Sequence, residues 1–135
     1  MDRKEFCVLM AKAKQESGRG TSDISFDMKM LLPTLRRFEK GEHNFNLKKV
    51  MEYLQVINAH IQIDKNIIAD YENLLAWLVD IRHSLSQRAL AKEIECAPLT
   101  IANIERKETI ISIDTFLKIV DVLGCTINIE NNKFV

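Results

Sequence analysis

Basic side chains gather in one short stretch of the chain, between positions 36 and 49. The stretch holds Arg36, Arg37, Lys40, His43, Asn44, Lys48 and Lys49. Lysines and arginines at this density are typical of a surface that contacts phosphates, although a solvated loop or helix face would explain His43, Lys48 and Lys49 equally well. Residues 1–63 hold eleven Lys and Arg against eight Asp and Glu, whereas residues 64–135 hold eight against eleven. The chain, whose formal net charge is zero, is therefore positive in its first half and negative in its second.

The side chains that enzymes use most often form no recognisable pattern. His43, His60 and His83 stand singly, and the three cysteines lack CxxC spacing. The sequence contains neither a glycine-rich phosphate loop nor a nucleophile elbow. We therefore predict that the protein is not an enzyme and that it uses no cofactor and no metal. The cysteines are expected to pack as small apolar side chains.

A chain of 135 residues can form one ordinary domain or two very small ones. Its four Gly and two Pro leave few helix breakers, which favours helices joined by short connections. No apolar run approaches the ~18 residues that a membrane span needs, and the first residues lead into no signal-peptide core. We expect a cytoplasmic protein that does not enter a membrane.

An internal repeat is visible when the chain is compared with itself at an offset of 66 residues. The identical pairs include Thr34 and Thr100, Glu39 and Glu105, Glu42 and Glu108, Val56 and Val122, Ile61 and Ile127, and Ile63 and Ile129. These few identities alone could arise by chance, but the apolar positions also agree over most of the aligned length. The first domain is therefore predicted to span residues 1–64, and the second residues 65–135.

Each unit is expected to contain four short helices and one strand. In the second unit, apolar residues at helical spacing predict a helix over Leu74–His83 and another over Gln87–Glu95. Pro98 opens a third helix, and Ser112 caps a fourth that ends before Gly124. The predicted fold class is all-α, with a small two-stranded β ribbon.

Two segments with strict alternation of apolar and polar residues, Ala59–Asp64 and Cys125–Glu130, are predicted to be half-buried strands. A lone strand of this length is unstable, so we expect the two to pair with each other and give a single-chain pseudo-dimer. Pairing with the strand of a second molecule, which would give a homodimer, is the alternative. Between the units, Ile67, Ile68 and Tyr71 are expected to join the next helix early.

A set of landmarks within residues 74–124 carries a family likeness. They are Ser86-Gln87, Leu90-Ala91, Thr100-Ile101, Ile104-Glu105, Phe116 and Leu123-Gly124. In type and spacing they resemble the Xre/Cro-repressor type of helix-turn-helix domain. Through the repeat, residues 5–58 look like a degenerate second copy. The resemblance implies tandem four-helix domains of the lambda-repressor type. Members of this family include bacterial and phage repressors, which bind specific sequences of double-stranded DNA, usually as dimers.

The resemblance also implies recognition helices at about Leu32–Phe38 and Pro98–Ile104, each lying in the major groove. The residues expected to contact DNA are Thr34, Arg36, Arg37, Lys40, His43, Asn44, Lys48, Lys49, Gln87, Thr100, Asn103 and Lys107. In the family, the first two helical positions and the sixth usually read base edges. The corresponding residues here are Leu32, Pro33 and Arg37, and then Pro98, Leu99 and Asn103. Apolar residues can touch a thymine methyl group but form no hydrogen bond with a base.

A structural ion pair in each unit is a further implication of the resemblance. In the family, the carboxylate equivalent to Glu39 or Glu105 commonly pairs with a basic residue of the first helix. Lys14 stands at that place in the first unit. The acidic Asp80 stands at that place in the second unit, so Arg82 would have to pair with Glu105 instead.

These features predict a DNA-binding transcriptional regulator without catalysis. The alternative is a protein-interaction module that keeps the helix-turn-helix fold, has lost DNA readout, and binds a toxin or another regulator. The apolar segments Leu31-Leu32-Pro33 and Ala97-Pro98-Leu99 favour this alternative, and the basic residues between positions 36 and 49 oppose it. Nucleic-acid binding weakens steeply with salt, so a salt titration distinguishes the two.

Overall fold

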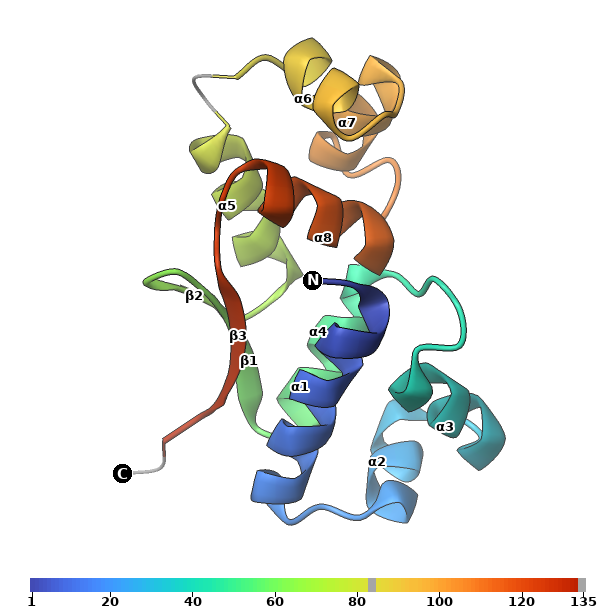
Figure 1. Cartoon of the computed structure of the whole chain (residues 1–135). Helices are drawn as coiled ribbons and strands as arrows, with labels where there is room; N and C mark the ends of the chain where they lie inside the picture. The colour runs from blue at the N-terminus through green and yellow to red at the C-terminus, as the bar shows by residue number, and fades with distance from the viewer. Residues whose placement is uncertain (83–84, 134–135) are drawn as a thin grey trace.

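Eight helices and three short strands make up the part of the chain that the computed structural model describes, residues 1–82 and 85–133. The first half contains α1 (Arg3–Ser17), α2 (Thr21–Met28), α3 (Leu32–Lys40), α4 (Leu47–Val56) and the strand β1 (Ala59–Ile63). The second half contains β2 (Asn66–Ile68), α5 (Tyr71–Ile81), α6 (Gln87–Glu93), α7 (Pro98–Glu105), α8 (Ile113–Val122) and β3 (Ile127–Asn131). The predicted mostly helical fold with a small sheet is confirmed (Figure 1).

Caps in the sequence set most helix boundaries. Ser112 accepts a hydrogen bond from the backbone of Thr115, so the predicted cap of the last helix is confirmed. The helix predicted to run through Glu95 ends two residues earlier, because Glu95 itself adopts a left-handed φ of 59°. The helix predicted to begin at Leu74 already begins at Tyr71, and His83, its predicted last residue, lies outside the described residues.

The sheet has three antiparallel strands in the order β2-β1-β3, where the sequence predicted two. The expectation that Ile67 and Ile68 join the next helix is wrong. Asp64, with a left-handed φ of 53°, turns the chain back on itself, and Ile68 then pairs with Ile61 and is buried. Tyr71 does belong to the helix, as predicted, and is its first residue.

The strands β1 and β3 of the same chain pair with each other, which was the arrangement preferred from the sequence. Ile61 lies opposite Ile129, and Gln62 lies opposite Asn128 at the middle of the ribbon. The isoleucines of both strands are buried beneath α1 and α4, which pack against β3 and β1. β3 begins two residues later than predicted, because the chain is still turning away from α8 at Gly124, where φ is 68°.

A second backbone pairing joins the loops that lead into α4 and α8. Asn46 and Ser112, which cap these two helices, form an isolated β-bridge. The N–H of the residue after each cap donates to the carbonyl oxygen of the residue before the other cap, at 2.9 and 2.8 Å. The repeat offset of 66 residues relates Asn46 to Ser112 and also Gln62 to Asn128, so both pairings join equivalent positions.

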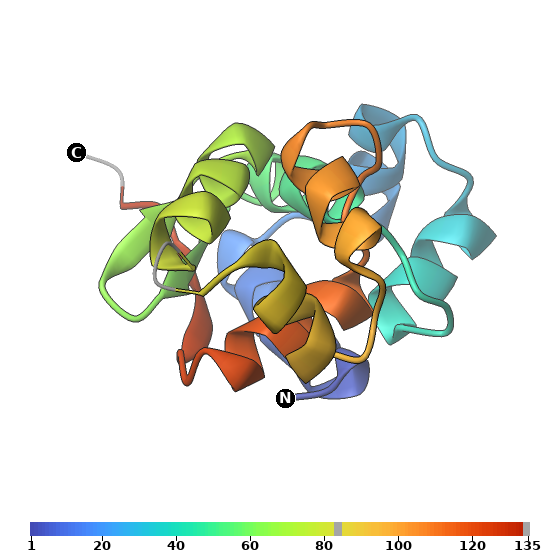
Figure 2. The ribbon, with the colours of Figure 1, turned by 90° about the horizontal axis from the view of Figure 1, so that it is seen from above.

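One hydrophobic core runs through both halves of the molecule. Trp77 is buried in it and meets Phe116 edge-on, with ring centroids 6.4 Å apart. The sheet lies at one side of the molecule (Figure 1). On its other side, α3 and α7 lie apart from each other, with the first turns of α4 and α8 between them (Figures 1 and 2). Within the described ranges, no helix is long and apolar enough to cross a membrane.

Candidate nucleic-acid interface

The helix α3 presents three cations because its apolar residues fix the opposite face. Leu35 and Phe38 are buried, which turns Arg36, Arg37 and Lys40 toward solvent. We call these three residues the α3 cations. None of them forms an ion pair with any residue that the structure describes. Their charges are therefore free to meet an anionic partner.

The turn after α3 brings the following loop close to α1. Gly41 has a left-handed φ of 68°, which favours glycine, and a Cβ there would lie 3.0 Å from Sγ of Cys7. In the loop, His43 is exposed, and the side-chain oxygen of Asn44 accepts a hydrogen bond from the backbone of Asp114 at 3.1 Å. Of these two predicted DNA contacts, Asn44 is thus engaged with its own chain.

The remaining candidates of the first half differ in exposure. Lys48 is exposed and lacks an ion pair among the residues described. Nζ of Lys49 lies 3.6 Å from a carboxylate oxygen of Glu52. Thr34 is half-buried in the first turn of α3. Of these three candidates, Lys48 is therefore the one that is exposed and unpaired, as the α3 cations are.

An ion pair and a hydrogen bond hold α3 against α1 and α4, and a further hydrogen bond joins α1 to α2. Oε2 of Glu39 lies 2.9 Å from Nζ of Lys14, which confirms the predicted pair. The hydroxyl of Tyr53 donates to the same oxygen at 2.6 Å, and Lys14 donates to the hydroxyl of Thr21 at 2.7 Å. Burial raises the pKa of Tyr53, and the Glu39 carboxylate raises it further. The role of Tyr53 was not predicted, because an apolar pattern does not show which buried tyrosine bonds to a carboxylate.

The equivalent network in the second half is centred on Glu105. Arg82 donates from Nε and Nη2 to the two carboxylate oxygens, so the predicted substitution of Arg82 for the missing cation is confirmed. Nε2 of Gln87 donates to the same carboxylate at 2.9 Å. Burial disfavours the charged form of Glu105, but the hydrogen bonds from Arg82 and Gln87 outweigh it and hold its pKa below the usual value. Gln87, expected to contact DNA, thus has its amide engaged within the protein.

Two more candidates of the second half are also engaged with neighbours. The side-chain oxygen of Asn103 accepts a hydrogen bond from Arg106 at 2.9 Å. Nζ of Lys107 lies 2.6 Å from a carboxylate oxygen of Glu72. Thr100 is exposed, and its side chain has no hydrogen bond within the described parts of the chain. Of the four predicted contacts on this side, only Thr100 is uncommitted.

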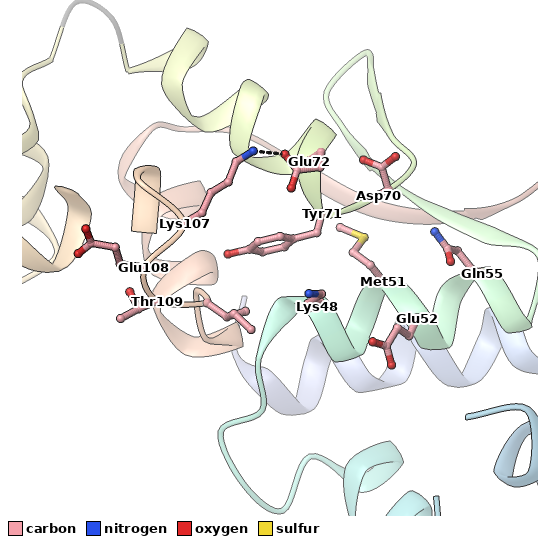
Figure 3. A pocket seen from close by; sticks show the side chains of 11 residues that line it. Lys48, Met51, Glu52, Gln55, Asp70, Tyr71, Glu72, Lys107, Glu108 and Thr109 are labelled. Atoms are coloured by element: carbon pink, nitrogen blue, oxygen red, sulfur yellow. Dashed lines mark ion pairs between the residues drawn. The ribbon is translucent and has the colours of Figure 1, made fainter. Parts of the chain in front are cut away.

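A cleft of about 670 Å³ between α4, the start of α5 and the loop after α7 explains the position of Lys107. Figure 3 shows Lys107 and Glu72 meeting at one side of this cleft, above the ring of Tyr71. The hydroxyl of Tyr71 accepts a hydrogen bond from the backbone of Ile111 at 3.1 Å and so holds the loop. Lys48 lines the cleft from α4. Two basic residues, Lys48 and Lys107, and four acidic residues line the cleft, so it carries more negative than positive charge.

Two further cations, on α6, were not predicted from the sequence. Arg88 and Lys92 are exposed, and neither has an ion-pair partner among the residues in 1–82 and 85–133. They stand four residues apart and so share one face of the helix, opposite the buried Leu90. Their helical spacing opposite buried residues is the signal that would have found them.

An ion pair that the sequence also did not reveal ties the two halves together. The guanidinium of Arg3 donates to both carboxylate oxygens of Asp114, at 3.0 and 2.6 Å, and to the carbonyl oxygen of Gly41 at 3.3 Å. The hydrogen bond from Arg3 holds the pKa of Asp114 below its usual value. The first turn of α1, the loop after α3 and the first turn of α8 are therefore fixed relative to one another.

Exposed apolar side chains also lie near both α3 and α7. Phe26 at the end of α2 is 83% exposed, and Leu31, just before α3, is 76% exposed. Leu99, in the first turn of α7, is 61% exposed. These residues offer apolar contact and no hydrogen bonds to a partner.

The cysteines behave as packing residues. Cys7 is buried, Cys96 and Cys125 pack partly buried against the core, and burial raises the pKa of all three thiols. In the part of the chain that the structure describes, no three His, Cys, Asp or Glu side chains are placed to hold a metal ion.

Comparison with known families identifies the second half of the chain. Residues 75–129, which run from α5 to β3, match the family model described as helix-turn-helix. Comparison with curated proteins and with solved structures gave no match. The matched segment contains α6, α7 and the carboxylate Glu105 that joins them to α5 through Arg82. The likeness carried by residues 74–124 is therefore confirmed in part: this segment of the chain is similar to the helix-turn-helix family.

Proposed function

We propose that the protein is a sequence-specific, DNA-binding transcriptional regulator that acts without catalysis. The helix-turn-helix domain of residues 75–129 carries this proposal. The α3 cations support it, because a surface that meets duplex DNA needs exposed, uncommitted positive charge.

In this proposal the two halves are tandem helix-turn-helix domains, residues 1–64 and 65–135, related by an internal two-fold axis. The two helices α4 and α8 have the same length and lie at the repeat offset of 66 residues. The bridge between Asn46 and Ser112 and the pairing of Gln62 with Asn128 join equivalent positions, as a two-fold axis requires. One chain would then present both recognition helices that a repressor dimer presents.

The α3 cations divide into two roles. Arg36 and Arg37 are adjacent in a helix, so their side chains point about 100° apart and cannot make the same contact. Arg37 stands at the position that often reads a base in the resembled family, and its guanidinium fits guanine O6 and N7. Arg36 and Lys40 would contact phosphates, together with Lys48 and Lys49 and with the loop residues His43 and Asn44. Thr34, Gln87, Thr100, Asn103 and Lys107 complete the proposed set of contacts.

A salt-titrated binding assay tests the proposal. The full chain should bind random-sequence duplex DNA at low salt, and its affinity should fall linearly with salt on logarithmic axes. Selection from a random pool should then yield a preferred sequence. Absence of binding at low salt, or undiminished binding of an Arg36→Ala, Arg37→Ala double variant, would reject DNA readout.

A protein-interaction module is the second candidate, favoured by the exposed Phe26 and Leu31. Such a module would keep the helix-turn-helix fold and bind a toxin or another regulator through this apolar surface. Phe26→Ser should then abolish the interaction while DNA affinity, if there is any, stays unchanged. The two candidates therefore respond to different substitutions.

A further inference from the structure

We propose that one molecule of this chain binds one non-palindromic DNA site whose two halves are recognised differently. In the first half-site, α3 reads base edges. In the second, α6 holds the DNA backbone through Arg88 and Lys92, and α7 reads no base by hydrogen bond. This inference rests on the proposed function and specifies its substrate.

The side chains on the two recognition helices are not interchangeable. At the repeat offset, the residues Arg36, Arg37 and Lys40 correspond to Ala102, Asn103 and Arg106. The α3 cations have no ion-pair partner in the described ranges, whereas Arg106 donates to Asn103 at 2.9 Å and also lies 3.9 Å from Glu108. A base contact through Oδ1 of Asn103 would compete with its bond to Arg106. The helix α7 therefore offers less hydrogen-bonding capacity for bases than α3 does.

The helices that precede α3 and α7, which are α2 and α6, differ in the opposite sense, because here the second half carries the exposed cations. Arg88 and Lys92 on α6 are exposed and unpaired within the described residues, and the corresponding residues of α2 are Ser22 and Phe26. In helix-turn-helix proteins the helix before the recognition helix crosses the DNA backbone. Two cations on one face of α6 would each neutralise a phosphate there. Backbone contact in the second domain thus comes from α6, while base contact in the first comes from α3.

The chain fixes these two unequal surfaces relative to each other. The Asn46–Ser112 bridge, the β1–β3 pairing and the Arg3–Asp114 ion pair all connect the two halves. The helices α3 and α7 lie on either side of the bridge (Figure 1). A palindrome places the same base at equivalent positions of both halves, yet here those positions face Arg37 in one domain and Asn103 in the other. A palindromic site therefore gains no affinity over a site with only one specified half.

Selection and footprinting on the intact chain test this inference. Sequences selected from a random duplex pool should show a base preference in one half only. Hydroxyl-radical footprints on a selected duplex should nevertheless show two protected backbone segments, about one helical turn (~10 base pairs) apart. Sedimentation of the complex should give one protein per duplex.

Matched variants assign the two roles. Arg37→Ala should weaken binding to the selected duplex roughly 5- to 150-fold and relax the preference at one base pair. Asn103→Ala should weaken binding to the selected duplex less than Arg37→Ala does and should leave the selected sequence unchanged. Arg88→Ala and Lys92→Ala should each lower the salt slope by about one unit without changing the selected sequence. All four residues lie at the surface or half-buried, and an unchanged melting temperature confirms that each variant is folded.

The outcomes separate this inference from the proposed function. A palindromic selected sequence, two proteins per duplex, or an Asn103→Ala loss as large as that of Arg37→Ala would overturn the inference and leave DNA regulation standing. Protection of one backbone segment only would also overturn it, because the second domain would then not hold DNA. Absence of binding to any duplex at low salt would overturn both.

Discussion

The neighbourhoods of α3 and α7 occupy similar places in the chain but use their polar side chains differently. Around α3, the exposed cations have no ion-pair partner in the described residues, and the interior network uses Lys14, Glu39 and Tyr53. Around α7, Asn103, Lys107 and Gln87 are each bonded to a neighbour. The helix that matches the family better by sequence therefore has fewer uncommitted groups for a partner. A match to a helix-turn-helix pattern locates the scaffold, while the pairing of its charges decides what the scaffold can bind.

Deletion of residues 125–135 should have the largest effect of the changes proposed here, a loss of stability in both halves, because it removes the strand that pairs the second half with the first. The deletion exposes β1 and removes Ile127 and Ile129, which are 7% and 8% exposed. Large-to-small changes at buried isoleucines cost about 2–5 kcal/mol each, so stability should fall by more than about 4 kcal/mol. Urea denaturation followed by Trp77 fluorescence, together with sedimentation, measures the loss and any association through the free strand edge.

Asn128→Ala is the control for that deletion, since Asn128 lies on the exposed face of the same strand. It should leave the midpoint of unfolding within a few tenths of a molar of the parent. A truncated protein that stays monomeric and melts like the parent would show that β3 does not hold the halves together.

Glu105→Gln should have the next largest effect, because it leaves Arg82 without its charged partner in a largely buried place. We expect a loss of about 1–3 kcal/mol at neutral pH. Since the folded-state pKa of Glu105 lies below its usual value, this contribution is present above pH ~4.3 and disappears as the pH falls through the folded-state pKa. Urea titrations at pH 7 and at successively lower pH measure the difference between variant and parent.

Glu108→Gln provides the comparison, because Glu108 is three residues farther along and its side chain is 61% exposed. This substitution should change stability by less than about 0.5 kcal/mol at any pH. The stability difference between the Glu105 variant and the parent should shrink as the pH falls. A difference that grows on acidification would contradict this prediction.

Arg36→Ala and Lys40→Ala sharpen the comparison at the DNA surface. Each should weaken binding to all duplexes about equally and lower the salt slope by about one unit, because each removes one phosphate contact. Lys65→Ala, at the β1–β2 turn on the far side of the molecule, should leave the slope unchanged (Figure 1). If all three substitutions changed the salt slope equally, DNA binding would depend on the total positive charge of the protein and not on the cations of α3.

Glu72→Gln should have the smallest effect on DNA affinity, and it should raise the affinity where the preceding substitutions lower it. It releases Lys107 from its ion pair, and an exposed pair of this kind stabilises by only about 0–1 kcal/mol. A free Lys107 near α7 should raise DNA affinity by no more than about fivefold and steepen the salt slope by up to one unit. Combination with Lys107→Ala should cancel the gain. A gain that persists in the double variant would show that Glu72 itself repels DNA.

The sequence alone predicted the features that depend on local pattern. Apolar spacing, capping residues and strict alternation marked most of the helices and two of the three strands, because these signals act over a few residues. The structural partners Lys14 of Glu39 and Arg82 of Glu105 followed from the family likeness. The strand β2 was missed, since its formation depends on the turn at Asp64 and on the already formed edge of β1.

The tertiary structure decided which polar groups remain available. Lys107 and Lys40 look alike in the sequence, but folding brings the carboxylate of Glu72 within bonding distance of Lys107. It also joins Arg3 to Asp114, residues that lie more than a hundred positions apart. Such pairs depend on how helices pack, because a side chain's partner is set by distance in space and not by its place in the chain. The sequence therefore determined the helices and the cations they carry, and only packing determined which cations stay free.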